Sequence, residues 1–295
     1  MNKIISIDGG GTKTLGVLYD TSGNELKRST KGSSNFAVDV KDASQALIEV
    51  IDELIIDNVL SIHIGLSGFS MIPDKDKLIK SLEDLYQTRV YLYPDAYLGL
   101  YSAYEKDLPL IYVVGGTGSI IYSLVDNEFN RYGGYGHLFG DQGSAYGFVM
   151  DVFWDCLVAL DQNKKLNKVQ KALLNHLELS TNEDVIGYTH RVKKQEIASL
   201  ARLITQHQHS YVLKKIKKQA IIIAKGIEQV VKKKQLNKGL VIALRGGFLE
   251  SAPNAKQEVL NYLDKKHIKY TLNRDIKEAV YGGYIRAMLS KGKEI

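Results

Sequence analysis

The sequence predicts an α/β protein that contains two domains of similar architecture. Its 295 residues exceed one ordinary domain and suit two domains of about 100 to 200 residues each. Runs of β-branched residues alternate with segments of helical period along most of the chain. A strand, a glycine turn and a second strand open the chain at Lys3, and the same pattern returns at Leu110. We therefore expect one α/β arrangement to occur twice.

The first half of the chain is predicted as three strands followed by alternating helices and strands. Short β-branched runs bounded by turn residues predict the strands, and apolar residues at helical spacing predict the helices. In chain order, the expected elements are strands Lys3–Ile7, Thr14–Tyr19 and Glu25–Ser29, a helix over Lys41–Asn58, strand Ile62–Leu66, helix Lys75–Tyr86, strand Val90–Tyr93 and a helix that begins near Asp95.

The second half begins in the same way and then becomes mainly helical. Its first two strands flank a glycine turn, and Asp126-Asn127 is typical of a hairpin turn between strands. The expected elements are strands Leu110–Val114, Ser119–Leu124 and Phe129–Tyr132, helices between Gln142 and Lys234, buried strand Leu240–Leu244, helix Lys256–Lys265, strand Ile268–Leu272 and helix Asp275–Leu289.

The boundary between the two domains is expected in Asp107–Leu110, immediately before the repeated pattern begins. This boundary gives an N-terminal lobe of residues 1–108 and a C-terminal lobe of residues 109–295. The prediction also allows the last helix, Asp275–Leu289, to pack on the N-terminal lobe.

Two glycine turns carry the chemistry of phosphate binding. The first places Asp8 at a strand end, then Gly9, Gly10 and Gly11, then the side chains of Thr12, Lys13 and Thr14. Glycines permit positive φ and close approach of backbone N–H groups to phosphate oxygens, and Asp8 can hold Mg²⁺ through water. The second turn, Gly115-Gly116-Thr117-Gly118-Ser119, repeats this chemistry. Neither turn matches a P-loop or a dinucleotide-binding fingerprint.

Composition narrows the classes of function. The chain starts without an export signal and has no apolar run of about 20 residues, so we expect a soluble, cytoplasmic protein with no membrane partner.

Cys156 is the only cysteine, which excludes a disulfide within the chain. Cys156, Met150 and Trp154 are expected in the core. The net charge of +6 includes lysines at 214, 215, 217 and 218, which suit the solvated face of a helix better than a nucleic-acid site.

With these residues in hand, the chain resembles the family that unites N-acetylglucosamine kinases with the BadF/BadG/BcrA/BcrD ATPases, in the sugar kinase/heat-shock ATPase/actin superfamily. The resemblance covers nearly the whole length and depends on the order of the motifs. These motifs are the two glycine turns, Leu66-Ser67-Gly68, Pro94-Asp95-Ala96, Gly133-Gly134-Tyr135-Gly136-His137 and Gly140-Asp141-Gln142-Gly143-Ser144-Ala145-Tyr146.

The resemblance implies a fold and an activity. The fold is two actin-like (ribonuclease H-like) lobes with ATP and sugar in a cleft between them. The activity is ATP- and Mg²⁺-dependent phosphorylation of an N-acetylated amino sugar such as N-acetylglucosamine, at the 6-hydroxyl. A homodimer is common among similar proteins. N-acetylmuramic acid or glucosamine as the substrate, or an ATPase activity without a sugar, remain alternatives.

The resemblance also assigns roles to residues. Asp95 matches the general base, although its position before a helix also suits an N-cap. The adenosine motif matches Gly246 and Gly247, and Thr117 and Gly118 face both ligands. The positions that match sugar contacts are Asn35, Ser67, Gly68, Asp95, Thr117, Gly134, Tyr135, Gly136 and Asp141. The family more often carries tryptophan at Tyr135, glutamate at Gln142 and histidine at Phe36.

Overall fold

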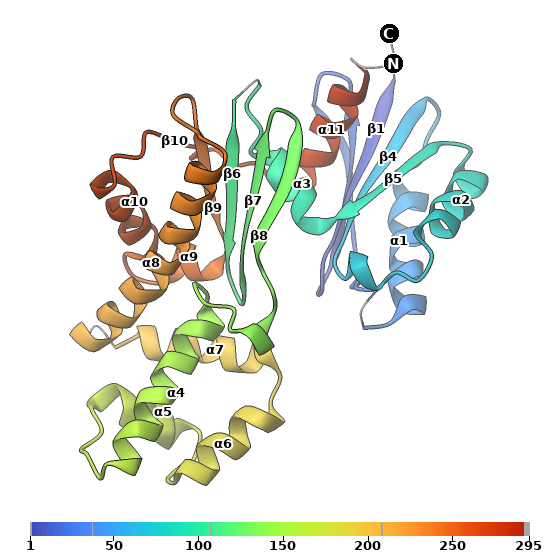
Figure 1. Ribbon diagram of the computed structural model, residues 1–295. Coiled ribbons are helices and arrows are strands. Elements are labelled where there is room, and N and C mark those ends of the chain that lie inside the picture. Colours follow the sequence, from blue (N-terminus) through green and yellow to red (C-terminus); the bar gives the residue numbers. More distant parts are fainter. Residues whose placement is uncertain (1, 37, 107, 208, 292–295) are drawn as a thin grey trace. The chain divides into compact units, whose positions relative to one another are not determined.

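The computed structural model describes residues 2–36, 38–106, 108–207 and 209–291, and its contacts divide the chain into two compact units. Unit 1 comprises the residues up to Lys106 together with those from Arg274 onward, and unit 2 comprises the residues between them. Asp107, in the expected boundary, lies outside the described residues. The contacts of the last helix therefore group it with the first unit in Figure 1.

Unit 1 is built on a five-stranded mixed sheet. The strands are β1 (Lys3–Gly9), β2 (Thr14–Asp20), β3 (Glu25–Lys31), β4 (Val59–Leu66) and β5 (Arg89–Pro94). Their order across the sheet is β3-β2-β1-β4-β5. The first three strands form an antiparallel meander, and β4 and β5 add to β1 in parallel. The carboxyl ends of β1, β4 and β5 consequently meet at one edge of the sheet.

Helices cover both faces of this sheet, as Figure 1 shows. One face packs against α1 (Val40–Leu54) and α2 (Lys75–Tyr86), and the other packs against α3 (Asp95–Ser102) and α11 (Tyr281–Lys291). The period of two along β1 explains this division, because Ile5 and Ile7 point toward α1 whereas Ile4 packs with Val280 and Tyr284. Burial on both faces accounts for the nearly continuous apolar character of β1.

Unit 2 repeats the sheet of unit 1. Its strands are β6 (Leu110–Gly115), β7 (Ser119–Val125), β8 (Glu128–Gly133), β9 (Val241–Arg245) and β10 (Thr271–Leu272), in the order β10-β9-β6-β7-β8. The meander is antiparallel, and β9 pairs in parallel with both β6 and β10. Asp126 and Asn127 both have positive φ in the turn before β8, as the hairpin prediction requires.

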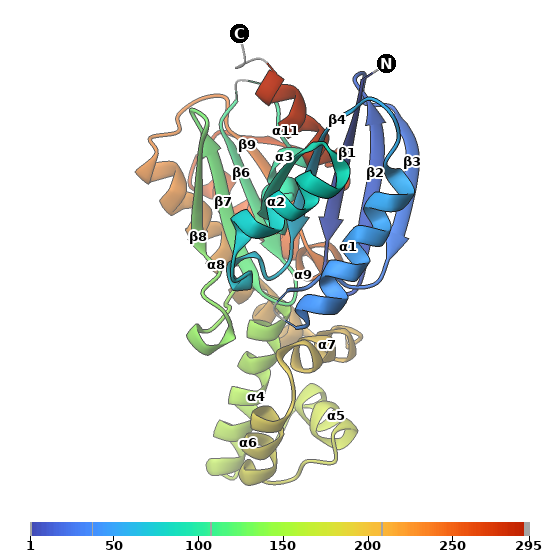
Figure 2. The ribbon, with the colours of Figure 1, turned by 90° about the vertical axis from the view of Figure 1, so that its right-hand side faces the viewer.

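The helices of unit 2 differ from those of unit 1. Where unit 1 has α1 alone, unit 2 has the long segment α4 to α8, part of which extends beyond the end of the sheet in Figure 2. Their bounds are α4 (Ala145–Asp161), α5 (Lys168–His176), α6 (Asn182–Arg191), α7 (Lys194–Thr205) and α8 (Ser210–Lys233). Two further helices, α9 (Gly247–Ser251) and α10 (Ala255–Lys265), follow β9. One core joins these helices to one face of the sheet.

Several sequence predictions need correction. The helix predicted to end at Asn58 ends at Leu54, where Ile55 adopts extended geometry. The strand predicted over Ile268–Leu272 is two residues long, and the helix predicted from Asp275 begins six residues later, at Tyr281. The short helix α9 was not predicted. Cys156 is buried as expected, but Trp154 is 66% exposed and therefore is not a core residue.

Three lysines in the lysine-rich part of α8 form ion pairs with acidic residues of unit 2. Lys215 pairs with Asp155 at 2.7 Å, Lys217 with Glu258 at 2.9 Å, and Lys218 with Asp151 at 2.6 Å. These pairs support the interpretation of the segment as an ordinary helix face. Among the described residues, no helix combines the length and the apolar character that are needed to cross a membrane.

Candidate active site

The first glycine turn joins β1 to β2 in unit 1. Gly10 donates its N–H to the Lys13 carbonyl at 2.9 Å, which closes a four-residue turn directly after Asp8 and Gly9. None of the three glycines has positive φ, so the turn does not use the left-handed backbone that glycine permits. Glycine is needed at Gly9 because other atoms pack closely on it: a Cβ there would lie 2.3 Å from the Ser34 hydroxyl.

The ends of the neighbouring strands bring other predicted residues to the same edge. Ser67 follows β4 and donates its N–H to the Gly9 carbonyl at 2.7 Å, and Gly68 continues the chain at φ +72°. Asn35 lies beside the turn, with its amide nitrogen 3.7 Å from where a Cβ on Gly11 would be. Unit 1 thus gathers the first glycine turn and these residues, which were predicted to contact the sugar, in one place.

Asp95 is the first residue of α3, directly after β5. Pro94, and not Asp95, is the N-cap of this helix, and the Asp95 carboxylate accepts the N–H of Ala96 at 2.7 Å. The register aligns Asp8 with Gly65 and Gly65 with Tyr93, so two strand spacings, about 10 Å, separate the backbones near Asp8 and Asp95. Both carboxylates lie at the edge where parallel strands end, a usual place for ligands in α/β sheets.

The electrostatics of the two carboxylates are coupled. Burial, and then the negative charge of Asp95, raises the pKa of Asp8 to about 6, and Lys13 opposes this shift. Burial also raises the pKa of Asp95, while the hydrogen bond from Ala96 lowers it. Buried acidic groups with raised pKa values at a strand edge are typical of functional sites, because folding alone gains nothing from them.

The second glycine turn joins β6 to β7 in unit 2. Gly116 donates its N–H to the Gly118 carbonyl at 2.9 Å, and the carbonyls of Gly116 and Thr117 accept N–H groups from the start of α4 at 2.8 and 3.2 Å. Gly246, at φ +105°, packs on this turn so closely that a Cβ on it would lie 2.6 Å from the Gly115 carbonyl. The structure therefore brings the predicted adenosine motif, Gly246 and Gly247, against the second phosphate turn.

The predicted substrate loop follows β8. Gly134 and Gly136 have φ of +67° and +88°, and Arg131 donates to the Gly133 and Gly134 carbonyls. Tyr135 is 73% exposed, so its ring is available to a ligand. Gly134, Tyr135 and Gln142 line a cavity of about 360 Å³ between β7, the loop and α8.

Asp141 ends this loop with a buried side chain at φ +40°. Its carboxylate forms an ion pair with Lys194 beside Gly118, where a Cβ would lie 2.9 Å from Asp141 Oδ2. Lys194 was not predicted as a site residue, because 53 positions separate it from Asp141 and it looks like one of many helix lysines. Gln219 was missed for the same reason, yet its buried amide accepts the Gly143 N–H at 2.6 Å.

A second cavity of unit 2, of about 370 Å³, lies next to the phosphate turn. Its lining includes Gly116 and Thr117 of the turn, Gln195, Ala198 and Arg202 of α7, Gly247, Phe248 and Ser251 of α9, and Ala252, which follows α9. An adenosine-sized ligand fits a cavity of this size with mixed apolar and polar walls. The lining from α7 was not visible in the sequence.

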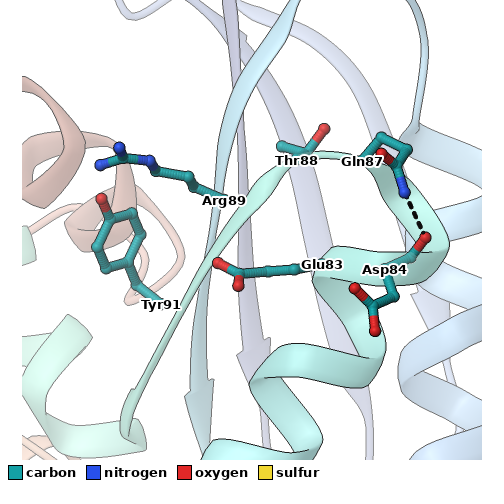
Figure 3. Close-up of a pocket in the computed structure, with 6 residues that line it drawn as sticks. All are labelled: Glu83, Asp84, Gln87, Thr88, Arg89 and Tyr91. Carbon is teal, nitrogen blue, oxygen red and sulfur yellow. Dashed lines mark hydrogen bonds between the residues drawn. The ribbon is translucent and has the colours of Figure 1, made fainter.

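A wider hollow of about 540 Å³ lies in unit 1, where α2 leads into β5 (Figure 3). Its lining includes Glu83, whose carboxylate accepts the Val90 N–H at 3.0 Å, and Gln87, whose amide donates to the Asp84 carbonyl at 2.7 Å. This hollow is at the amino end of β5, whereas Asp95 follows its carboxyl end. It is therefore separate from the predicted site.

Two α/β units with the same strand order, each opening on a strand, a glycine turn and a strand, define the two-lobed actin-like class of protein. The chain belongs to the BadF/BadG/BcrA/BcrD ATPase family, whose model matches residues 5–288.

Individual relatives agree with this assignment. The chain is 28% identical to an N-acetylmuramic acid/N-acetylglucosamine kinase of Clostridium acetobutylicum, over 97% of this chain and 98% of that protein. It is 34% identical to an N-acetyl-D-glucosamine kinase of Dictyostelium discoideum, over 68% of each. A solved protein of Chromobacterium violaceum shares the fold at a TM-score of 0.73 and 20% identity, covering 97% of this chain and 98% of that one.

Proposed function

We propose that this protein is an ATP-dependent sugar kinase that phosphorylates an N-acetylated amino sugar at its 6-hydroxyl. The observation that carries the proposal is the placement of Asp95 and Asp8 at the edge of one sheet, beside the first glycine turn. The names of the relatives from Clostridium acetobutylicum and Dictyostelium discoideum support an amino sugar as the substrate.

Asp95 acts as the general base in the proposed reaction. It takes the proton of the sugar hydroxyl while the hydroxyl oxygen forms a bond to the γ-phosphorus and the bond from that phosphorus to the ADP oxygen breaks. The raised pKa of Asp95 makes the carboxylate a better proton acceptor than an exposed aspartate. Positioning and charge stabilisation supply most of the catalysis in phosphoryl transfer, and the base contributes about 10²- to 10⁴-fold.

The glycine turns hold the phosphates in this proposal. The backbone donors are in Gly10 to Thr12 of the first turn and in Gly116 to Ser119 of the second. Within these ranges the N–H groups of Gly10 and Gly116 close their own turns, so the phosphate donors are those of Gly11 and Thr12 and those of Thr117 to Ser119. The adenosine occupies the cavity of about 370 Å³ that Gly116 and Gly247 line. The remaining contacts to the sugar come from Asn35, Ser67, Gly68, Thr117, Gly134, Tyr135, Gly136 and Asp141.

Mg²⁺ fits the residues of unit 1. It binds proteins through one or two carboxylates and takes its other ligands from phosphate and water, so a larger protein cluster is unnecessary. Among the described residues there is no group of three or more metal-ligating side chains. Asp8 offers a partly buried carboxylate whose raised pKa a cation would lower again. When bound, the ion would neutralise charge on the β- and γ-phosphates.

The proposal is tested by the rate of ADP release with a panel of sugars at saturating Mg·ATP. The panel contains N-acetylglucosamine, N-acetylmuramic acid, glucosamine and glucose, which differ in the acetyl, amino and lactyl groups that they carry. It also contains 6-deoxy-N-acetylglucosamine, which lacks the hydroxyl that would accept the phosphoryl group. We expect fast release with at least one N-acetylated sugar and basal release with the 6-deoxy sugar. Fast release that no sugar changes would overturn the kinase in favour of an ATPase.

A further inference from the structure

The two phosphate turns differ in charge. The first turn contains its own cation, Lys13, whereas the second turn, Gly115 to Ser119, contains no charged residue. A polyphosphate carries several negative charges, and glycine N–H groups alone supply only partial positive charge. A protein side chain that adds a full positive charge at the second turn therefore has to come from another part of the chain.

The fold brings Lys194 to this place. Lys194 is the first residue of α7, and a Cβ on Gly118 would lie 2.7 Å from its ammonium nitrogen. The lysine side chain is 23% exposed, while that of its partner Asp141 is only 3% exposed. The ammonium thus lies beside a buried carboxylate and the backbone of the second turn, and the lysine side chain as a whole is partly exposed.

The same helix also borders the cavity assigned to the nucleotide. Gln195, Ala198 and Arg202 of α7 line it together with Gly116 and Thr117 of the turn. The amino end of α7 adds the partial positive charge of a helix terminus beside Lys194. If a nucleotide fills this cavity and its phosphates lie at the turn, the phosphate oxygens come close to the Lys194 ammonium.

We infer that Lys194 is the phosphate-binding cation of the second turn, and that Asp141 competes with the nucleotide for it. This inference rests on the proposed function. It adds Lys194 to the nucleotide site and adds Asp141 as a group that competes with the phosphates for Lys194. In the free protein, Asp141 neutralises the ammonium. When a polyphosphate binds, Lys194 hydrogen-bonds its oxygens, and the attraction between Lys194 and Asp141 is shared with the ligand.

The first test measures nucleotide binding by calorimetry on the full chain with Mg²⁺ and without sugar. Lys194→Met is expected to weaken ADP and ATP binding by about 10- to 100-fold, the effect of one lost charge-assisted hydrogen bond, and to leave adenosine binding unchanged. Lys194→Arg is expected to retain most of the affinity. Lys193→Met is the matched control, because it removes the same charge from the adjacent, exposed residue.

The second test uses the competitor. Asp141→Asn frees the ammonium, so ADP binding is expected to become several-fold tighter, whereas the double variant Lys194→Met/Asp141→Asn is expected to bind ADP more weakly than Asp141→Asn. The double variant also avoids leaving a buried carboxylate unpaired, which is the main reason for Lys194→Met alone to lose stability. ADP affinity that is equal in Asp141→Asn and the double variant would overturn the inference, as would an equal loss of adenosine and ADP binding in Lys194→Met.

These measurements are independent of the sugar. If the charge dependence of ADP binding is found and no sugar is phosphorylated, the inference stands and the proposed kinase activity fails. If sugar is phosphorylated and Lys194→Met binds ADP like the original protein, the kinase stands and the inference fails.

Discussion

At the scale of single residues, the proposed function gives Asp95 the role of general base. The sequence left a choice between a helix cap and a base, since Asp follows Pro94 at the start of a helix. The structure makes Pro94 the cap, and the Asp95 carboxylate accepts the N–H of Ala96 and has a raised pKa. A carboxylate that only capped the helix would accept the N–H groups two or three residues later.

Asp95→Asn keeps the shape of the side chain and removes the basicity of its carboxylate. The amide oxygen can still accept the Ala96 N–H, so we expect native folding and ATP affinity. Loss of the base should lower kcat by about two to four orders of magnitude. Steady-state kinetics with a phosphorylated sugar measure this, with Asp74→Asn, an exposed N-cap of α2, as the control. A kcat above about a tenth of the original would refute the role as base.

Asp8 predicts a pH dependence. Because its pKa in the folded protein is about 6, the carboxyl is protonated below that pH and cannot hold Mg²⁺. We expect kcat/KM for Mg·ATP, measured from pH 5 to 8 with saturating sugar, to fall about tenfold per pH unit below pH 6. A profile that stays flat down to pH 5 would contradict the role of Asp8.

The raised pKa of Asp8 also makes the stability of the folded protein depend on pH. The folded pKa of Asp8 is above the ordinary value of 3.8, so the folded protein holds a proton that the unfolded chain releases. Its stabilising effect is full below pH 3.8 and is lost as the pH rises through 6. Asp8→Asn should therefore raise Tm at pH 7 and change it little at pH 4.

At the scale of elements, the strands were easier to predict than the helix ends. The strands of both meanders are short β-branched runs between turn residues, and their predicted and observed bounds differ by one or two residues. The predicted start of the last helix is wrong by six residues, although Lys277 and Glu278 suit a helix by intrinsic propensity. Glu278 instead lies before the helix and forms an ion pair with Arg28 of β3 at 2.8 Å. Tertiary context can override propensity in this way.

The packing of α11 on α3 depends on small residues. A Cβ on Gly282 would lie 1.9 Å from the Leu98 carbonyl oxygen, and one on Gly283 would lie 2.0 Å from the Ser6 hydroxyl. Both glycines are therefore sites where α11 packs closely on its neighbours. The doublet lets the returning helix contact the sheet and α3 together.

Gly282→Ala should therefore cost about 3 kcal/mol of unfolding free energy, because backbone atoms of α3 have to move. Gly187→Ala in α6 is the matched control, since a Cβ there meets nothing within 4 Å. That variant should gain up to about 1 kcal/mol from helix propensity. Urea denaturation of both variants measures the difference, and an equal effect of the two alanines would show that the α11–α3 contact is not tight.

At the scale of the whole molecule, the repetition was readable from the sequence and the long-range contacts were not. Both sheets have the same strand order, and both glycine turns lie in the first hairpin of their unit. The pattern of strands and turns repeats along the chain and so could be predicted. The approach of Lys194 to Asp141 and of Gly246 to Gly115 depends on how distant segments fold together, which local patterns do not encode.

The stoichiometry of products tests phosphoryl transfer to an amino sugar most directly. Purified protein with Mg·ATP and N-acetylglucosamine, or the preferred N-acetylated sugar, should yield one equivalent of sugar 6-phosphate per equivalent of ADP, measured together by mass spectrometry and an ADP assay. Water as the acceptor would instead give ADP and inorganic phosphate. ADP that accumulates with the sugar unmodified would contradict the kinase.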